Sequence, residues 1–215
     1  MKKAFLFLLV AGVATTASAQ HLRLNLYSSY VFDDGFSNYT GANSYYNGKL
    51  KGGLQLGGGI EYMADPTYGV ELVYFYKNSD APSNFKFGTL NTERNETFDV
   101  TQHFIMVAGN SHIHTGNQKV EGFGGLLVGM SITDVKAPST GNKTSNTNFA
   151  WGGRLGVNLF LSDKVGIKLM SQILSATRAS GGDLYYGYWG PVAVPDYSTL
   201  WQFGLGGGLT FRLGK

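Results

Sequence analysis

The sequence contains no cysteine, and no apolar run in it is long enough to form a membrane-spanning helix. Disulfide cross-links are therefore excluded. A transmembrane helix needs about 20 consecutive, mostly apolar residues, so a helical membrane protein is excluded as well. Charged residues make up only 14% of the 215 residues, whereas an average soluble domain has about 25%. Apolar surface in such a chain must lie at alternating positions instead of in continuous runs.

The charges that are present nearly cancel. The formal net charge is +3, and it falls to +1 if the two N-terminal lysines, Lys2 and Lys3, are removed. This balance gives no reason to expect nucleic acid as a partner. Glycine and aromatic residues, by contrast, are frequent, with 31 glycines and 14% aromatic residues.

The N-terminus has the three parts of a secretory signal peptide. Lys2 and Lys3 form a basic start, residues 4–14 are apolar, and Ala17-Ser18-Ala19 is an A-x-A cleavage site. We expect residues 1–19 to be a signal peptide cleaved after Ala19, and residues 20–215 to form one domain. Because no cysteine follows the cleavage site, a lipoprotein anchor is excluded.

The stretch 149–174 shows the main structural pattern of the chain. Apolar residues and glycine occupy every second position from Phe149 to Leu161, while small, polar or mixed residues lie between them. This period of two predicts a strand with two different faces. Ser162-Asp163-Lys164 predicts a tight turn, and the alternation resumes at Val165. Both limbs are as long as a bilayer-spanning strand of roughly 9–11 residues.

The same alternation recurs along the chain and predicts eight strands. Short connections at 65–69, 115–117 and 162–164 alternate with long polar ones. The long connections are 33–49, 78–95, 135–146 and 177–198. An even number of strands with alternating short and long connections is typical of a closed membrane barrel, with short periplasmic turns and long extracellular loops.

One expected strand, residues 96–113, has no clear register. Phe104 and Met106 share one face, and Ile105 and Val107 share the other. Either a β-bulge or a strand that is apolar on both faces would explain this pattern.

Three stretches carry a family resemblance: LQLGGGIEY (54–62), GGRLGVNLFLSDKVGIKL (152–169) and FGLGGGLTFRL (203–213). With them the chain resembles the small eight-stranded outer-membrane β-barrels, the OmpA-like and OmpX-like proteins, and particularly the Gly-rich porin-like proteins of Bacteroidetes. The resemblance implies an all-β, closed, antiparallel transmembrane barrel in the outer membrane of a Gram-negative cell. Outer-membrane lipid and the periplasmic insertion machinery would then be its partners. The chain departs from many such barrels because it does not end on an aromatic residue.

A soluble, lipocalin-like barrel would also have eight strands, but its apolar face would lie inside. Alternation alone does not show which face lines the interior. Long strands, aromatic residues near the strand ends and a glycine-rich second face favour the membrane barrel with a polar lumen. The charged residues expected in this lumen are Arg23, Glu61, Glu71, Lys77, Glu121, Arg154, Lys168 and Arg212. Their mixed signs favour a structural network over an ion or proton path.

Other chemistry has weaker support in the sequence. His112 and His114 share a strand face and could bind a metal, but no third ligand lies nearby in the sequence. His103 with Ser131 would suggest an outer-membrane hydrolase, although no G-x-S-x-G motif exists. We therefore predict no catalytic residue, metal or cofactor.

The functional prediction rests on location and loops. The fourth long connection is rich in aromatic residues, and its candidate interaction residues are Tyr185, Tyr186, Tyr188 and Trp189. We expect a structural or surface-interaction role through the extracellular loops, with an extracellular ligand or surface partner. The alternative is a narrow porin-like channel for small solutes, and a more remote one is an outer-membrane lipid-modifying enzyme.

Overall fold

The computed structural model describes residues 21–41, 44–86, 94–114, 119–177, 186–187, 190–191 and 200–213. Nearly all of these residues lie in strands. Within these ranges, no helix is both long and apolar enough to cross a membrane. The expected signal peptide, 1–19, and the expected turn at 115–117 lie outside the described residues.

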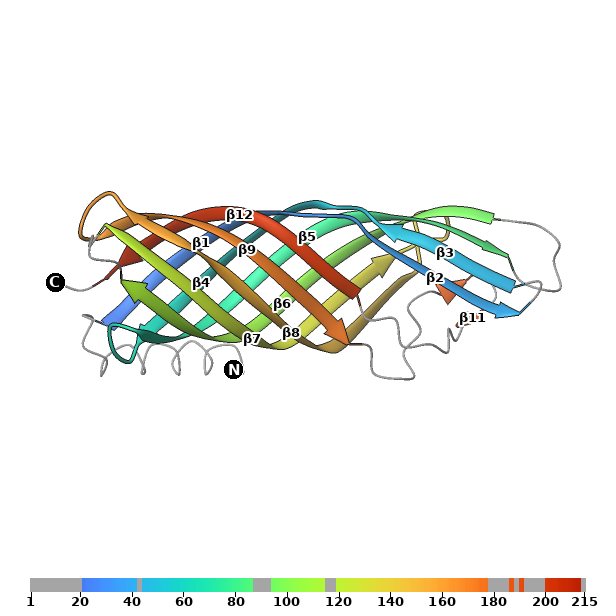
Figure 1. Ribbon diagram of the computed structural model, residues 1–215. Coiled ribbons are helices and arrows are strands. Elements are labelled where there is room, and N and C mark those ends of the chain that lie inside the picture. The colour runs from blue at the N-terminus through green and yellow to red at the C-terminus, as the bar shows by residue number, and fades with distance from the viewer. Residues whose placement is uncertain are drawn as a thin grey trace.

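Eight strands form one closed ring (Figure 1). Each strand pairs antiparallel with the next, and the last pairs back with the first. In ring order the strands are β1 (Leu22–Val31), β4 (Gly53–Met63), β5 (Tyr68–Lys86), β6 (Arg94–His114), β7 (Val120–Lys136), β8 (Lys143–Phe160), β9 (Val165–Thr177) and β12 (Leu200–Arg212). The predicted closed eight-stranded antiparallel barrel is therefore confirmed.

The two ends of the barrel differ. At one end, which we call the turn end, short connections join the strands, and the described chain begins and stops there. The Oδ1 atom of Asp65 accepts hydrogen bonds from the backbone N–H groups of Thr67 at 2.6 Å and Tyr68 at 2.9 Å. Ser162 Oγ likewise accepts the N–H of Val165 at 3.2 Å. Short polar side chains thus fix these turns through their own backbone.

At the other end, which we call the extended end, paired strands continue well beyond the ring. β2 (Asp34–Gly41) and β3 (Ser44–Leu50) form a hairpin, and β3 also pairs with β5. Pairing of β5 with β6 continues up to Phe85 and Arg94, and that of β7 with β8 up to Lys136 and Lys143. These strands form one projecting sheet (Figure 1).

The prediction of long loops at 33–49, 78–95 and 135–146 is therefore wrong for most of their residues. The physical reason is that ladder hydrogen bonds need only backbone groups, whereas the sequence pattern depends on a contrast between two faces. Where both faces of a strand carry polar residues, that contrast disappears. In the fourth connection, the structure describes only β10 (Tyr186–Gly187) and β11 (Gly190–Pro191), which pair with each other.

The two faces of the barrel wall separate apolar from charged residues as the alternation predicts. Leu155 and Leu205 point outward and are 65% and 48% exposed. Arg154, next to Leu155, is only 4% exposed, and Glu71 is completely buried. An arrangement with the charged face outside, as in a lipocalin, is therefore excluded for the ring.

The register of β6 is regular, so the bulge alternative is wrong. Its pairing with β5 and β7 proceeds residue by residue, without a shift. Phe104 and Met106 point inward and are buried, whereas Ile105 and Val107 point outward. The strand is apolar on both faces because the lumen at this level is itself filled by apolar side chains.

The outer face changes in character along the strands. At the extended end, directly paired residues form a charged row of Asp80, Asp99, Lys136 and Lys143. Nearer the ring, aromatic side chains follow: the rings of Trp151 and Trp201 lie 5.2 Å apart, and those of Phe32 and Phe203 lie 5.6 Å apart. Beyond these, towards the turn end, the outward residues are mainly aliphatic or small. This order matches the aromatic girdle and apolar band of a membrane barrel.

The outward position of Leu155 leads to a stability prediction. We expect Leu155→Arg to destabilise the protein folded in lipid vesicles by about 2–4 kcal/mol, because the cation would lie in the apolar band. Leu161→Arg, on the same chain segment at the turn end, is the matched control and should cost about 0–1 kcal/mol. Urea unfolding in vesicles measures both, and equal costs would contradict the assignment of the apolar band.

Candidate functional site in the barrel lumen

Glu121 is the centre of the first group of charges in the lumen. It is completely buried on β7, and its carboxylate accepts hydrogen bonds from both terminal nitrogens of Arg23, at 2.6 and 3.2 Å. His112 Nδ1 lies 2.7 Å from it, Asn158 Nδ2 lies 2.8 Å away, and Arg212 lies 3.3 Å away. A forked guanidinium contact of this kind is among the strongest charged hydrogen bonds in proteins.

Glu71 is the centre of the second group. Arg154 forms an ion pair with its carboxylate, and the Tyr27 hydroxyl donates to it at 2.7 Å. Arg154 also donates to Asn110 Oδ1 at 2.9 Å and to the Tyr27 oxygen at 3.1 Å. Gly59 leaves the room for this carboxylate, since a Cβ there would lie 2.0 Å from Glu71 Oε1.

Like charges stand directly opposite each other on neighbouring strands. Glu61 pairs in register with Glu71, and Arg23 pairs with Arg212. Like charges at directly opposite positions repel, and the only contact of opposite sign within this row of four is between Arg23 and Glu61. Asn25 and Asn110 each bridge both glutamates, at distances between 2.6 and 3.3 Å.

These contacts cross the lumen from wall to wall. Arg23 on β1 and Glu121 on β7 lie on opposite sides of the ring. His112 joins the two groups, because its Nε2 lies 2.8 Å from Glu61 and its Nδ1 lies 2.7 Å from Glu121. An eight-stranded barrel has an interior just wide enough for its own side chains. We call this set the charge network; it fills the lumen near the turn end.

Cation–ring contacts hold two further charges of the network. The Lys168 ammonium lies 3.8 Å from the centre of the Phe123 ring, and the Arg212 guanidinium lies 3.5 Å from that of Phe160. The face of an aromatic ring attracts a cation. Seven of the eight expected lumen charges thus lie together: Arg23, Glu61, Glu71, Glu121, Arg154, Lys168 and Arg212.

Lys77 also points into the lumen, but the expectation that it pairs with the other charges is not met. Its inward neighbours along β5 towards the charge network are Phe75 and Val73, which belong to an apolar band inside the barrel. Towards the extended end, a second apolar cluster, the apolar cap, lies above Lys77. The cap consists of Leu50, Ala81, Phe98, Val100, Val135 and Ala137. Two apolar layers therefore separate Lys77 from other buried charges.

The sequence did not single out several polar members of the network. Asn25, Tyr27, Asn110 and Asn158 are buried and bind its carboxylates or guanidinium groups. For Asn25, Tyr27 and Asn158 the available signal was their even spacing from a charged residue on the same strand, whereas Asn110 lies on β6, which carries none of the expected lumen charges. Asn158, for example, is completely buried and donates to Glu121 at 2.8 Å.

The histidine hypotheses have different outcomes. His112 and His114 do share a face, but both lie against Glu121, whose oxygens also bind guanidinium groups. No cluster of three or more metal-ligating side chains occurs in the part of the chain that the structure describes. His103 pairs in register with Ile132 and points outward, whereas Ser131 is buried on the inward face. The pairing of His103 with Ser131 is therefore wrong.

The aromatic interaction candidates cannot be placed. Tyr185, Tyr188 and Trp189 lie outside the described residues, and of Tyr186 only the backbone pairing with Pro191 is described.

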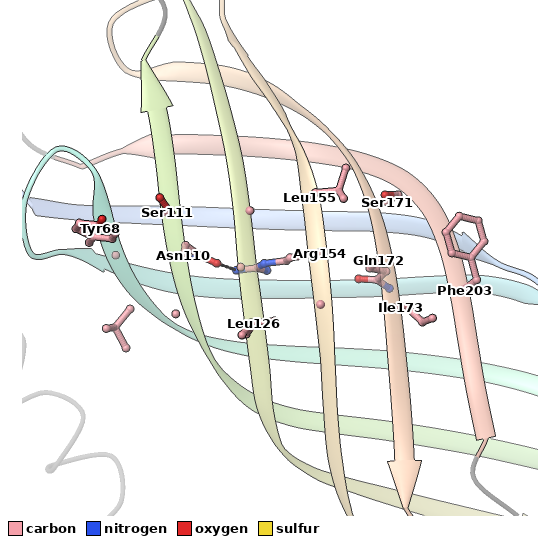
Figure 2. A pocket seen from close by; sticks show the side chains of 16 residues that line it. Tyr68, Asn110, Ser111, Leu126, Arg154, Leu155, Ser171, Gln172, Ile173 and Phe203 are labelled. Carbon is pink, nitrogen blue, oxygen red and sulfur yellow. Dashed lines mark hydrogen bonds between the residues drawn. The ribbon is translucent and has the colours of Figure 1, made fainter.

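The outer surface carries an apolar hollow of about 940 Å³ that crosses β5 to β12. Gly109 and Gly153 alternate there with Leu126 and Ile173 in one row of paired positions. Figure 2 shows Leu126, Leu155, Ile173 and Phe203 around it. Figure 2 also shows the Arg154 side chain hydrogen-bonded to Asn110, so Arg154 does not present an unpaired charge to the hollow.

No protein-family model and no curated protein matches this sequence. Solved structures do match its fold. Neisserial surface protein A is 10% identical, with a TM-score of 0.54, and the match covers 89% of this chain and 96% of that protein. The outer membrane protein OprG from Pseudomonas aeruginosa is 16% identical, with a TM-score of 0.57, and the match covers 91% and 97%.

The fold is that of a small outer-membrane β-barrel. The resemblance inferred from the strand pattern is thereby confirmed at the level of architecture, and the match extends over nearly the whole of each compared chain. Within the outer-membrane barrel fold, the charge network occupies the interior and the projecting sheet lies at one end.

The ion pair between Glu71 and Arg154 can be tested by a double-mutant cycle. We expect Glu71→Gln alone to cost about 3–5 kcal/mol of unfolding free energy, because it leaves Arg154 buried without its carboxylate. Arg154→Met in the same background should recover part of that cost. Urea unfolding in vesicles measures the cycle, with Asp163→Asn at an exposed turn as the control within about 0.5 kcal/mol. Strict additivity would show that the two side chains do not interact.

Proposed function

We propose that this protein is an integral barrel of the outer membrane that acts at the cell surface through the sheet at its extended end. Residues 1–19 would be its signal peptide, cleaved after Ala19, and the periplasmic insertion machinery and outer-membrane lipid would be its partners. The turn end would lie in the periplasm, in agreement with the short connections there. Lipid chains would fill the apolar hollow on the outer face.

The projecting sheet is the observation that carries this proposal. Backbone pairing continues beyond the aromatic girdle in β5 to β8, so the chain there forms a rigid surface. Its outward face bears a polar hollow of about 470 Å³, lined by residues that include Asp99, Asp134, Lys136 and Lys143. Rigid scaffolds that present polar groups in this way commonly carry binding function. An extracellular ligand or surface partner would bind here or at the fourth connection.

Because side chains fill the lumen, transport through the barrel is only the second candidate function. Arg23 reaches Glu121 across the barrel, and Gln202 donates to Gln102 across it at 2.7 Å. The apolar cap lies on the inward face of β3 and β5 to β7 nearer the extended end. These contacts support a closed interior, and the narrow channel for small solutes stays the alternative.

Planar-bilayer conductance distinguishes the two candidates. We expect the refolded wild-type protein to be silent, since its own side chains fill the lumen. Discrete current steps from the wild-type protein would overturn the proposal. If Arg154→Ala opens a conductance in a silent wild type, the network acts as a plug and the channel becomes the first candidate.

The surface location has its own test, which uses the lack of cysteine in the chain. We expect the K143C variant to react with a membrane-impermeant maleimide on intact cells, because Lys143 lies at the extended end. The D163C variant at the turn end should react only after the outer membrane is permeabilised. The reverse labelling pattern would place the projecting sheet in the periplasm and remove the proposed surface role.

A further inference from the structure

Lys77 is a fully buried cation without a hydrogen-bond partner. Lys77 is 0% exposed, and its Nζ atom has no hydrogen-bond partner within the described part of the chain. A buried ammonium group that is neither paired nor hydrogen-bonded carries a large desolvation cost. Its environment should therefore supply a compensating charge.

No carboxylate of the charge network reaches this position. Along β5 the inward residues run from Glu71 through Val73 and Phe75 to Lys77, so two apolar side chains lie between the glutamate and the lysine. On β6, Gln102 pairs with Lys77 in register and lies between buried Phe104 and buried Val100. Apolar side chains thus separate Lys77 from the charge network along β5 and along β6.

The carboxylates at the extended end are engaged elsewhere. Asp33 forms an ion pair with Lys49 and accepts the N–H of Gly52 at 2.6 Å, and these contacts hold the pKa of Asp33 below its ordinary value. Asp34 accepts the N–H of Trp201 at 2.9 Å. Both carboxylates lie close enough to attract Lys77 electrostatically, but neither forms a hydrogen bond or salt bridge with it.

The groups paired in register with Lys77 are two side-chain amides. Gln55 and Gln102 pair in register with Lys77 from its two sides, and all three side chains are buried on the inward face. The carbonyl oxygen of Gln55 accepts from Gln172, and that of Gln102 accepts from Gln202. Among the described residues, the amide nitrogens of Gln55 and Gln102 are left without a partner, as are Lys77 Nζ and the side-chain oxygens of Gln172 and Gln202.

We propose that Lys77, together with the side-chain amides of Gln55 and Gln102, binds a small monovalent anion such as chloride inside the barrel. Lys77 Nζ and the two amide nitrogens are donors without partners at directly paired positions, and the site carries one positive charge, which one negative charge would balance. The apolar layers on both sides keep the site dry and favour an ion with little hydration over a large or multiply charged one. The site is independent of the surface role proposed above.

Chloride-dependent stability tests this site in the purified, refolded protein. At constant ionic strength, replacing methanesulfonate by chloride should raise the unfolding midpoint of the wild type in a saturable way, because a ligand stabilises the state that binds it. Lys77→Met should abolish this dependence and, without chloride, should be at least as stable as the wild type. Lys51→Met, which removes an exposed lysine at the extended end, is the matched control and should keep the full chloride effect.

Crystals grown in bromide provide the direct measurement. An anomalous peak next to Lys77 Nζ, absent from Lys77→Met, supports the site, and Lys77→Gln serves if the methionine variant does not fold. The amides of Gln55 and Gln102 could instead turn over and present their oxygens to the ammonium group. Bromide crystals without a peak at Lys77, or equal chloride dependence in wild type and Lys77→Met, would overturn the proposal.

Discussion

The interior of this barrel depends on the repulsion between like charges on neighbouring strands. Glu61 faces Glu71 across one strand pair, and Arg23 faces Arg212 across another. Arg23 also stands directly opposite Glu61, and further compensating charges come from the far wall, as in the contact of Arg23 with Glu121. A slip of one residue in any of these strands would turn its charges towards the outer face. The network therefore ties the register of separate strands to one another.

The side-chain pattern of the wall inverts where the surroundings change. Inside the ring, apolar residues point outward and charges point inward, because lipid replaces water as the outer medium. In the projecting sheet, Phe98 and Val100 point inward and form the apolar cap, while Asp99 and Lys136 point outward. The same strands thus follow the rule of a membrane barrel along one part of their length and that of a soluble β-protein along another.

The ring was predictable because most of its strands have one apolar face that lipid requires. That single contrast located the inward position of Glu71, Glu121 and Arg154 without any structural information. The extent of the strands was not predictable, since β5 and β6 continue through polar residues where no contrast marks the faces. The register of β6 was not predictable for the opposite reason: apolar residues occupy both of its faces, so the sequence does not distinguish them. Which charges meet depends on strand stagger, and this explains why the isolation of Lys77 could not be read from the sequence.

The charged row at the extended end affects both the insertion of the barrel into the membrane and its retention there. If the barrel inserts from the periplasmic side, then Asp80, Asp99, Lys136 and Lys143 must all cross the hydrocarbon before they meet water again. A cation costs about 2–4 kcal/mol at the bilayer midplane, so this passage is a barrier to assembly. The same barrier opposes withdrawal once the sheet has emerged. With that direction of insertion, the projecting sheet would act as a kinetic anchor, which would hold the barrel in the membrane independently of its equilibrium stability.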